Sequence, residues 1–313
     1  MRIAVTGSTG LIGKALVSRL TADGHQVVRF TRSASPGHQG DARWDPASGV
    51  IDAEALAEVG AVVHLAGRSI AAPRWTARTR REILGSRVEG TRLLAETMAR
   101  LEGGPRVLVC ASGINWYGDR GDEVLTERSQ GGQGFLAELC RQWEAAAEPA
   151  RAAGIRTVHV RTGPVQAREG GTLAIQARLF RLGLGGRLGS GRQWLSWITL
   201  DDIVGMYLHA LTRQVHGPLN GTTPNPVTNA EFTATLARVL GRPALLAVPA
   251  FAPRLVLGEV TDELLLASIR VYPAAAQASG YAFRHPELEP ALRHVLDREK
   301  SACSPSPPSP EVP

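Results

Sequence analysis

The feature that most restricts how this chain can fold is a glycine-rich segment near its start, Thr6-Gly7-Ser8-Thr9-Gly10-Leu11-Ile12-Gly13. The apolar stretch Arg2–Thr6 leads into it, and an amphipathic stretch runs from Leu11 to Ala22 after it. A short apolar run predicts a buried strand, and apolar residues three and four positions apart predict a helix. The segment is therefore expected between the first strand and the first helix, where the spacing G-x-x-G-x-x-G is typical of a dinucleotide-binding fold.

The glycines of this turn have separate steric roles. Gly7 permits the tight turn, Gly10 lets the backbone approach a pyrophosphate, and Gly13 lets the helix pack closely against the strand. The helix N-terminus adds unpaired N–H groups and a partial positive charge, and both favour phosphate. The alternative is that the glycines only form the turn. We expect cofactor contacts here from Gly7, Thr9, Gly10, Leu11, Ile12 and Gly13.

The end of the second expected strand, Gln26–Thr31, indicates which dinucleotide binds. NAD-binding proteins carry an Asp or Glu there that holds the ribose 2′-hydroxyl, but this chain has no acidic residue between Gly24 and Gly40. Arg32 follows the strand, and an arginine can hold a 2′-phosphate. We therefore predict NADP(H), with contacts from Thr31 and Arg32. The alternative is that Arg32 is only a solvated cation.

Strand and helix patterns alternate through the first half of the chain. Further strands are expected at Ala61–Leu65, Arg106–Ala111 and Arg156–Arg161, and further helices at Thr76–Leu101 and Phe135–Ala153. Such alternation favours parallel strands joined by right-handed helical crossovers. The predicted fold class is α/β, with a Rossmann-type doubly wound parallel sheet and a smaller C-terminal α+β substrate domain.

The pattern changes in the second half of the chain. A glycine-rich loop spans 183–191, a strand is expected at Trp194–Leu200, and helices at Asp202–Leu211, with Asp201 as its N-cap, and at Asn229–Leu240. We predict an NADP(H)-binding domain at 1–220, in which 163–196 contributes to a substrate cleft, and a C-terminal domain at 221–300. The Ser- and Pro-rich residues 301–313 are expected to form a disordered tail.

Composition excludes several classes of protein. The three cysteines, Cys110, Cys140 and Cys303, lack C-x-x-C spacing, which predicts no disulfide framework and a reducing, cytoplasmic location. No membrane association is expected, because no apolar run reaches the ~18–20 residues that span a bilayer and the start lacks a signal-peptide pattern. The net charge of +6 comes from scattered cations with one cluster at 78–81, which argues against nucleic acid as a partner.

An ordered series of motifs runs along nearly the whole chain. Beyond Thr6–Gly13, its members are His64-Leu65-Ala66-Gly67, Gly85-Ser86-Arg87, Gly163 with Gly170-Gly171, Leu184–Gly191 with Gln193 and Ser196-Trp197-Ile198, Asp201-Asp202, Asn220–Phe232, Leu257-Gly258-Glu259, Pro273 and Gly280-Tyr281. The series resembles the extended short-chain dehydrogenase/reductase superfamily, and within it the atypical epimerase-family group of nucleoside-diphosphate-sugar epimerase-like proteins.

This resemblance implies further cofactor contacts. The end of the third strand would supply His64, Leu65, Ala66 and Gly67, the long helix Arg81, Ser86 and Arg87, and the end of the fifth strand Arg161, beside the nicotinamide. The alternative for His64 is a strand-end histidine satisfied by backbone. We predict no metal site, because no second His, Cys or acid stands at ligand spacing near His64.

The chain lacks the catalytic pair usual in this superfamily, a Tyr with a Lys four residues later that lowers its pKa. The residues four positions after its four tyrosines are Gly121, Leu211, Ala276 and His285. Aligning the later helix on Trp143-Glu144 places Leu136 and Cys140 at the two positions, and Cys140 is expected to be a small core residue. The superfamily's serine is also displaced, because Gly113 occupies its place and Ser112 precedes it.

Two functions remain open. The first is an NADP(H)-dependent oxidoreductase or epimerase-like enzyme acting on a small carbonyl or hydroxyl compound. Its catalytic candidates are Ser112 and Tyr117, which follow the fourth strand at its carboxyl end, although Tyr117 has the alternative of a buried aromatic. The second is a non-catalytic NADPH-sensing regulatory protein, which the missing Tyr and Lys favour. A small-molecule substrate is the expected partner, and a homodimer stays open.

Overall fold

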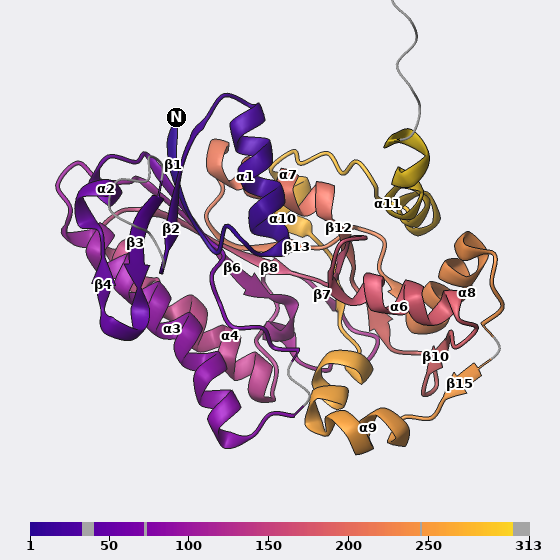
Figure 1. Cartoon of the computed structure of the whole chain (residues 1–313). Helices are drawn as coiled ribbons and strands as arrows, with labels where there is room; N and C mark the ends of the chain where they lie inside the picture. Colours follow the sequence, from indigo (N-terminus) through magenta and orange to yellow (C-terminus); the bar gives the residue numbers. More distant parts are fainter. Residues whose placement is uncertain (33–40, 72–73, 245, 303–313) are drawn as a thin grey trace, which may run out of the picture.

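An eight-stranded sheet runs through the centre of the computed structural model, which describes residues 1–32, 41–71, 74–244 and 246–302 (Figure 1). In spatial order the strands are β13 (Gly217–Gly221), β8 (Arg156–Thr162), β6 (Val107–Gly113), β5 (Ala61–His64), β1 (Arg2–Thr6), β2 (Gln26–Thr31), β3 (Asp41–Asp45) and β4 (Val50–Ile51). Neighbours are parallel except β3 and β4. Because β1 stands between β2 and β5, the chain winds first one way and then the other, which confirms the predicted doubly wound sheet.

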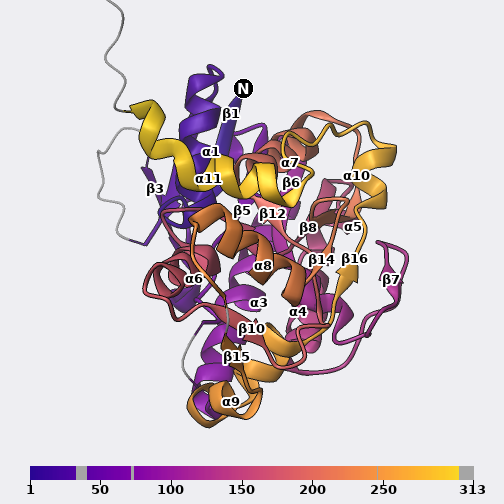
Figure 2. The same cartoon turned by 90° about the vertical axis from the view of Figure 1, so that its right-hand side faces the viewer.

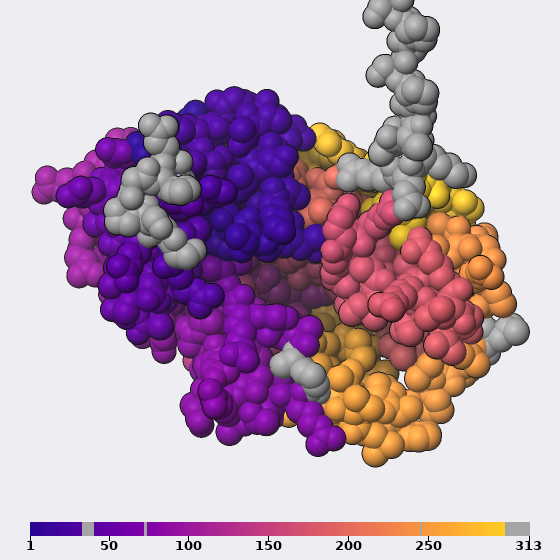
Figure 3. Space-filling model, viewed as in Figure 1, coloured from indigo at the N-terminus to yellow at the C-terminus, as the bar shows by residue number. Residues whose placement is uncertain are grey.

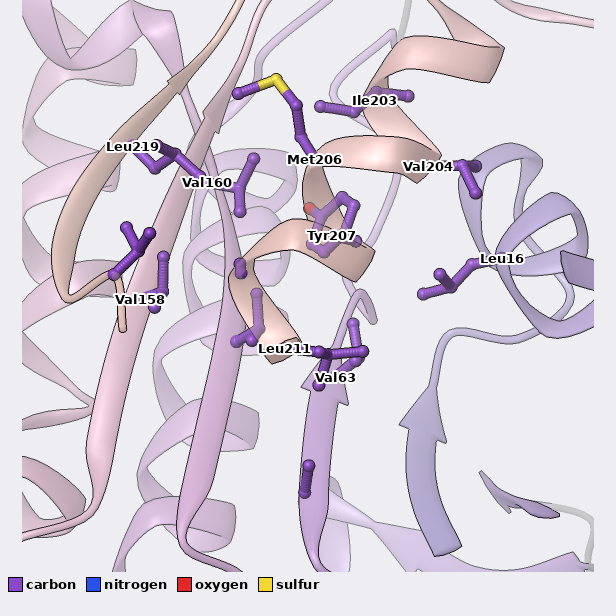
Figure 4. Close-up of a cluster of buried hydrophobic side chains, with 14 of the residues drawn as sticks. Leu16, Val63, Val158, Val160, Ile203, Val204, Met206, Tyr207, Leu211 and Leu219 are labelled. Atoms are coloured by element: carbon purple, nitrogen blue, oxygen red, sulfur yellow. The ribbon is translucent and has the colours of Figure 1, made fainter. Parts of the chain in front are cut away.

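Helices cover both faces of this sheet. One face carries α1 (Leu11–Ala22) and α7 (Leu200–Thr212), and the other carries α2 (Ala53–Ala57), α3 (Ala77–Arg100) and α5 (Glu148–Ala152). Val5 and Val63 enter the first core, whereas their neighbours Ala4 and Val62 enter the second, as the alternation of side chains along a strand requires. Figure 4 shows Tyr207 of α7 lying over the strands in the first core.

The later elements form a third core beside the sheet (Figure 2). It joins α6 (Gly171–Arg181), α8 (Asn229–Leu240) and α11 (Leu288–Ala302) around the fully buried Trp197. Outside the central sheet, short strands pair two by two: β9 (Val165–Gln166) with β12 (Ile198–Thr199), β10 (Gly186–Leu188) with β15 (Leu246–Val248), β11 (Trp194–Leu195) with β14 (Val227–Thr228), and β7 (Val124–Leu125) with β16 (Arg270–Val271). The helix α6 precedes residue 220, whereas α8 and α11 follow it, and all three contribute to this core. The domain boundary expected at 220 stays a prediction.

Two of the remaining helices lie in the lower part of Figure 1 and the third near its upper centre. They are α4 (Phe135–Ala145), α9 (Phe251–Leu257) and α10 (Ala274–Ala278), with short helical turns at Pro46–Ser48, Ile114–Tyr117 and Thr261–Leu266. None of the described helices is both long and apolar enough to cross a membrane.

Two expected elements are divided in the structure. The helix expected at Phe135–Ala153 is two helices, α4 and α5, because Pro149 lies in the first turn of α5 and a proline is compatible with a helix only near its start. The strand expected at Trp194–Leu200 is likewise two, β11 and β12, which pair with different partners, β14 and β9. Pairing across the chain, which a local pattern cannot show, divides this segment.

The start of α7 also differs from the expectation. Asp201 is not the N-cap; that position belongs to Thr199, whose Oγ1 accepts the backbone N–H of Asp202 at 3.1 Å. Asp201 lies in the first helical turn, where a carboxylate interacts favourably with the helix dipole. At the other end of the chain, α11 continues to Ala302, two residues into the expected tail, and residues 303–313 lie outside the described part.

Candidate functional site

The glycine-rich turn has the steric arrangement expected of it. Gly7 has a φ of +67°, and a Cβ there would stand 2.7 Å from the backbone nitrogen of Ala66. A Cβ on Gly13 would overlap the carbonyl oxygen of Gly7, so α1 can approach the turn only because Gly13 has no side chain. Gly10 is the N-cap of α1, with no side chain bonded to the free amides and no acid in the first turn. The steric roles of Gly7 and Gly13 are confirmed, and the role of Gly10 and the phosphate contacts stay predictions.

His64 and Thr6 close the bottom of this turn. Thr6 Oγ1 lies 2.7 Å from His64 Nδ1 and accepts the backbone N–H groups of Leu65 and Ala66 at 3.2 and 3.4 Å. Because these two donors occupy its lone pairs, the threonine hydroxyl donates to Nδ1, which places the imidazole hydrogen on Nε2. Burial, with the charge of Arg87 nearby, lowers the pKa of His64 to about 4. His64 is therefore neutral near pH 7. Its Nδ1 is bonded to the Thr6 side chain, whereas the alternative interpretation expected a bond to the backbone.

Ser86 and Arg87 on α3 hold the loop that follows β5. Ser86 Oγ accepts the backbone N–H of Arg68 at 3.0 Å, and Arg87 Nη1 donates to the Arg68 carbonyl at 2.8 Å. The Arg87 guanidinium lies over the Trp143 ring, and burial lowers its pKa to about 10. Arg81 is exposed on the same helix. The loop containing Gly67 is thus shaped by two of the expected residues, while their contact with a cofactor is untested.

Arg32 is exposed where β2 ends, and Thr31 before it is half-buried. The neighbouring strand β3 pairs Arg43 with Thr31. A second arginine therefore stands beside Thr31 at the edge where a 2′-phosphate is expected. Sequence reasoning missed Arg43, since only the pairing of β2 with β3 brings it there.

Glu144 of α4 is the centre of a buried polar network at the carboxyl ends of β6 and β8. Its carboxylate accepts a hydrogen bond from Ser112 Oγ at 2.7 Å, and two from Arg161, Nε at 2.9 Å and Nη2 at 2.8 Å. The Arg161 and Glu144 side chains are only 4% and 10% exposed. Burial opposes the charge of Arg161, but its bonds to Glu144 raise its pKa. The guanidinium also lies over Trp116, 3.9 Å from the ring centroid.

Tyr117 belongs to the same network. Its hydroxyl donates to Asn220 Oδ1 at 2.7 Å and accepts from Arg161 Nη1 at 3.1 Å. Burial raises the pKa of Tyr117 above its ordinary value. Ser112 and Tyr117 are 5% and 0% exposed, so both catalytic candidates lie inside the molecule with their hydroxyls engaged by other side chains.

Leu136 and Cys140, which stand where the superfamily places Tyr and Lys, are both buried on α4. Burial raises the pKa of Cys140 to about 11, so the thiol stays protonated near neutral pH. Cys140 is therefore confirmed as a core residue.

Glu144 is one helical turn further along and was missed by sequence reasoning. One feature of the sequence could have indicated Glu144: it is an acidic residue four positions after Cys140, on the same side of an amphipathic helix.

A cavity of about 380 Å³ is lined by the glycine-rich loop and its neighbours: Gly121, Asp122, Gly189, Ser190, Arg192, Gln193, Ala250, Leu266 and Ser268. Trp194 borders this region, and its Nε1 donates to Asp122 Oδ1 at 2.7 Å. A wider hollow separates the indigo and purple N-terminal part of the surface from the pink and orange later segments (Figure 3). The contribution of 163–196 to a substrate cleft stays a prediction.

A doubly wound sheet whose first strand ends in a glycine turn below a free helix N-terminus defines a Rossmann-type protein of the dinucleotide-binding class. Comparison with known proteins then identifies the family. Residues 3–222 match the NAD dependent epimerase/dehydratase family, and residues 248–295 match a domain of unknown function, DUF1731. The chain belongs to the NAD dependent epimerase/dehydratase family.

Relatives extend this similarity over almost the whole chain. An epimerase family protein of Mycobacterium leprae is 41% identical over 297 residues, which cover 95% of this chain and 96% of that protein. The crystal structure of the human epimerase family protein SDR39U1 with NADPH is 38% identical and superposes with a TM-score of 0.87, covering 95% of this chain and 99% of the human one. A nucleoside-diphosphate sugar epimerase from Corynebacterium glutamicum has a TM-score of 0.79 at 35% identity, covering 98% and 62% of the two chains.

Proposed function

We propose that this chain binds NADP(H) and acts on a small carbonyl or hydroxyl compound. The observation that carries the proposal is the cradle made by Gly7, Gly10 and Gly13 below the free amides of α1, at the edge where Arg32 follows β2. An acid that would hold a 2′-hydroxyl is absent from the described end of β2. The NADPH in the crystal structure of the human relative supports the same cofactor.

The chemistry would take place at the carboxyl ends of β6 and β8. A nicotinamide dinucleotide supplies the hydride when it is bound. The chain must then hold the substrate oxygen and manage one proton. Ser112 is our candidate for that role, because its hydroxyl donates to the carboxylate of Glu144, which can accept its proton. Tyr117 is fully buried and bonded to Arg161 and Asn220, so we assign it the positioning of this network.

The cofactor assignment is tested by the affinity of Arg32→Ala for two dinucleotides, measured by calorimetry. A charged hydrogen bond to a 2′-phosphate contributes about 1.5–3 kcal/mol, so NADPH should bind roughly 10- to 100-fold more weakly. NADH, which lacks the phosphate, should bind the variant and the parent alike. Arg29→Ala is the matched control on the same strand, because Arg29 is bonded to Asp41. Equal losses for both dinucleotides would remove the 2′-phosphate contact from the proposal.

A second function is favoured by one observation, the burial of both Ser112 and Tyr117 hydroxyls. In that case the chain senses NADPH and docks a partner without catalysis. We would incubate the protein and NADPH with quinones, aldehydes and nucleotide sugars. Turnover that is lost in Ser112→Ala and only reduced in Tyr117→Phe supports the enzyme. Tight NADPH binding without turnover, together with a partner that is captured only in the presence of NADPH, supports the sensor.

A further inference from the structure

Two histidines and an aspartate far from the glycine turn in sequence meet where α11 approaches α7 (Figures 1 and 2). Asp201 Oδ2 lies 2.8 Å from His294 Nε2 and 3.8 Å from His285 Nε2. The two imidazoles are stacked, with ring centroids 4.1 Å apart. One potential ligand atom from each of the three side chains lies within 4.8 Å of the other two. All three side chains are partly buried.

From these three side chains we infer a binding site for a divalent first-row metal ion, of which zinc fits the ligands best. Two imidazoles and a carboxylate are a ligand set that zinc uses in proteins, with bonds of roughly 2.0–2.2 Å and a fourth, open position. Tetrahedral bonds of that length place ligand atoms about 3.3 Å apart. The separations of 2.8 and 3.8 Å from Asp201 lie on either side of this value, but the two stacked imidazoles do not point at one ion, so metal binding must turn at least one ring about its side-chain bonds.

The backbone around the site is already fixed by the neighbouring Asp202. Its carboxylate accepts the backbone N–H groups of Arg284 at 2.8 Å and His285 at 3.0 Å, and the residue is only 1% exposed. Two adjacent aspartates thus have different tasks, because Asp202 anchors the segment that carries His285 while Asp201 faces the imidazoles. His294 is held by α11, whose Leu292 and Val295 are in the third core. These contacts hold the backbone from which the two imidazoles extend.

An independent observation points to a ligand at the same place. A small cavity beside Asp201 and His294 is also lined by Gln166, Arg168 and Glu169. Gln166 is 1% exposed, and its Oε1 has no hydrogen-bond partner among the described residues. A buried acceptor without a donor is rare and calls for a bound water or ion. A metal-bound water, or the metal itself, would satisfy this oxygen.

Arg168 opposes a cation by its charge, so Arg168→Ala should bind the metal at least as tightly as the parent.

The site would stabilise the C-terminal part of the molecule, since the ion would join α11 and the segment carrying His285 to α7. It neither uses nor requires the cofactor proposed above. Its failure would therefore leave the NADP(H) assignment untouched, and the reverse also holds.

The test is a calorimetric titration of the full chain, without a histidine tag and after treatment with a chelator, with Zn²⁺. One equivalent should bind, and the midpoint of thermal unfolding should rise with Zn²⁺ concentration. Loss of an outer-shell partner already weakens metal binding about 10- to 100-fold, so His294→Ala and His285→Ala should each lose at least as much. His216→Ala, at an exposed histidine outside the cluster, should bind as the parent does.

Two further measurements keep the result interpretable. If His294→Ala unfolds, His294→Gln replaces it, with circular dichroism as the check of folding. Substitution with Co²⁺ should produce visible absorption bands of a tetrahedral ion in the parent and none in His285→Ala. A parent that binds no Zn²⁺, or one whose affinity is unchanged in both folded histidine variants, overturns the inference.

Discussion

At the scale of single residues, the structure shows how neighbours decide the state of a side chain. His64 could be recognised in the sequence as the residue at the end of the third strand. Its neutrality could not, because it depends on the hydroxyl of Thr6 and the charge of Arg87, which lie on other elements. Gly7 and Gly13 are different, because the turn that needs them is only a few residues long. Their roles were predicted from the sequence alone.

The low pKa of His64 predicts how stability depends on pH. Because the folded-state pKa, about 4, lies below the ordinary 6.5, the unfolded chain takes up a proton first as the pH falls. The stability that His64 contributes is therefore fully present above about pH 6.5 and decreases towards pH 4. From pH 7 to pH 5 the parent should lose about 2 kcal/mol more than His64→Asn. Urea unfolding at the two pH values measures this difference, and parallel pH profiles would contradict it.

At the scale of elements, the sequence located helices better than it located their first residues. The bounds of α8 were predicted without error, because its capping box, Thr228 with Glu231, lies within four residues. The predicted start of α7, at Asp202, lies two residues after the observed start at Leu200, because both Thr199 and Asp201 can cap a helix. Only the pairing of β12 with β9 shows that the strand ends at Thr199 and the helix begins directly after it.

The cap at Thr199 can be tested directly. Thr199→Ala removes the oxygen that accepts the backbone N–H of Asp202, and should lower the free energy of unfolding by about 1–2 kcal/mol. Thr199→Ser keeps the hydroxyl and should recover most of the loss. Chemical denaturation of the three proteins measures both effects. An alanine variant as stable as the parent would show that another residue caps α7.

At the scale of the whole molecule, the buried network connects elements that are distant in sequence. Ser112 on β6, Glu144 on α4, Arg161 on β8 and Asn220 on β13 are joined through Arg161 and Tyr117. A buried ion pair costs desolvation, and it is tolerated when hydrogen bonds satisfy both partners. Here every polar atom of the Arg161 guanidinium has an acceptor or a ring beside it.

Breaking this ion pair should therefore be costly. Glu144→Gln or Arg161→Met alone leaves a buried charge without its partner and should cost about 3–5 kcal/mol of unfolding free energy. The double variant should cost less than the sum, by roughly 2 kcal/mol. Urea unfolding of the four proteins measures this coupling. The exposed pair of Glu148 and Arg151 is the control, in which no coupling is expected. Additive losses at Glu144 and Arg161 would contradict a coupled pair.

The glycine turn and most element positions could be predicted from residues a few positions apart, and the doubly wound α/β fold from the alternation of strand and helix patterns. Tertiary structure decided which groups the candidate hydroxyls contact and which side chains form the site at Asp201. Those contacts join residues 32 positions apart at Ser112 and Glu144, and 93 apart at Asp201 and His294. No local pattern encodes such separations; packing the helices onto the sheet brings the partners together.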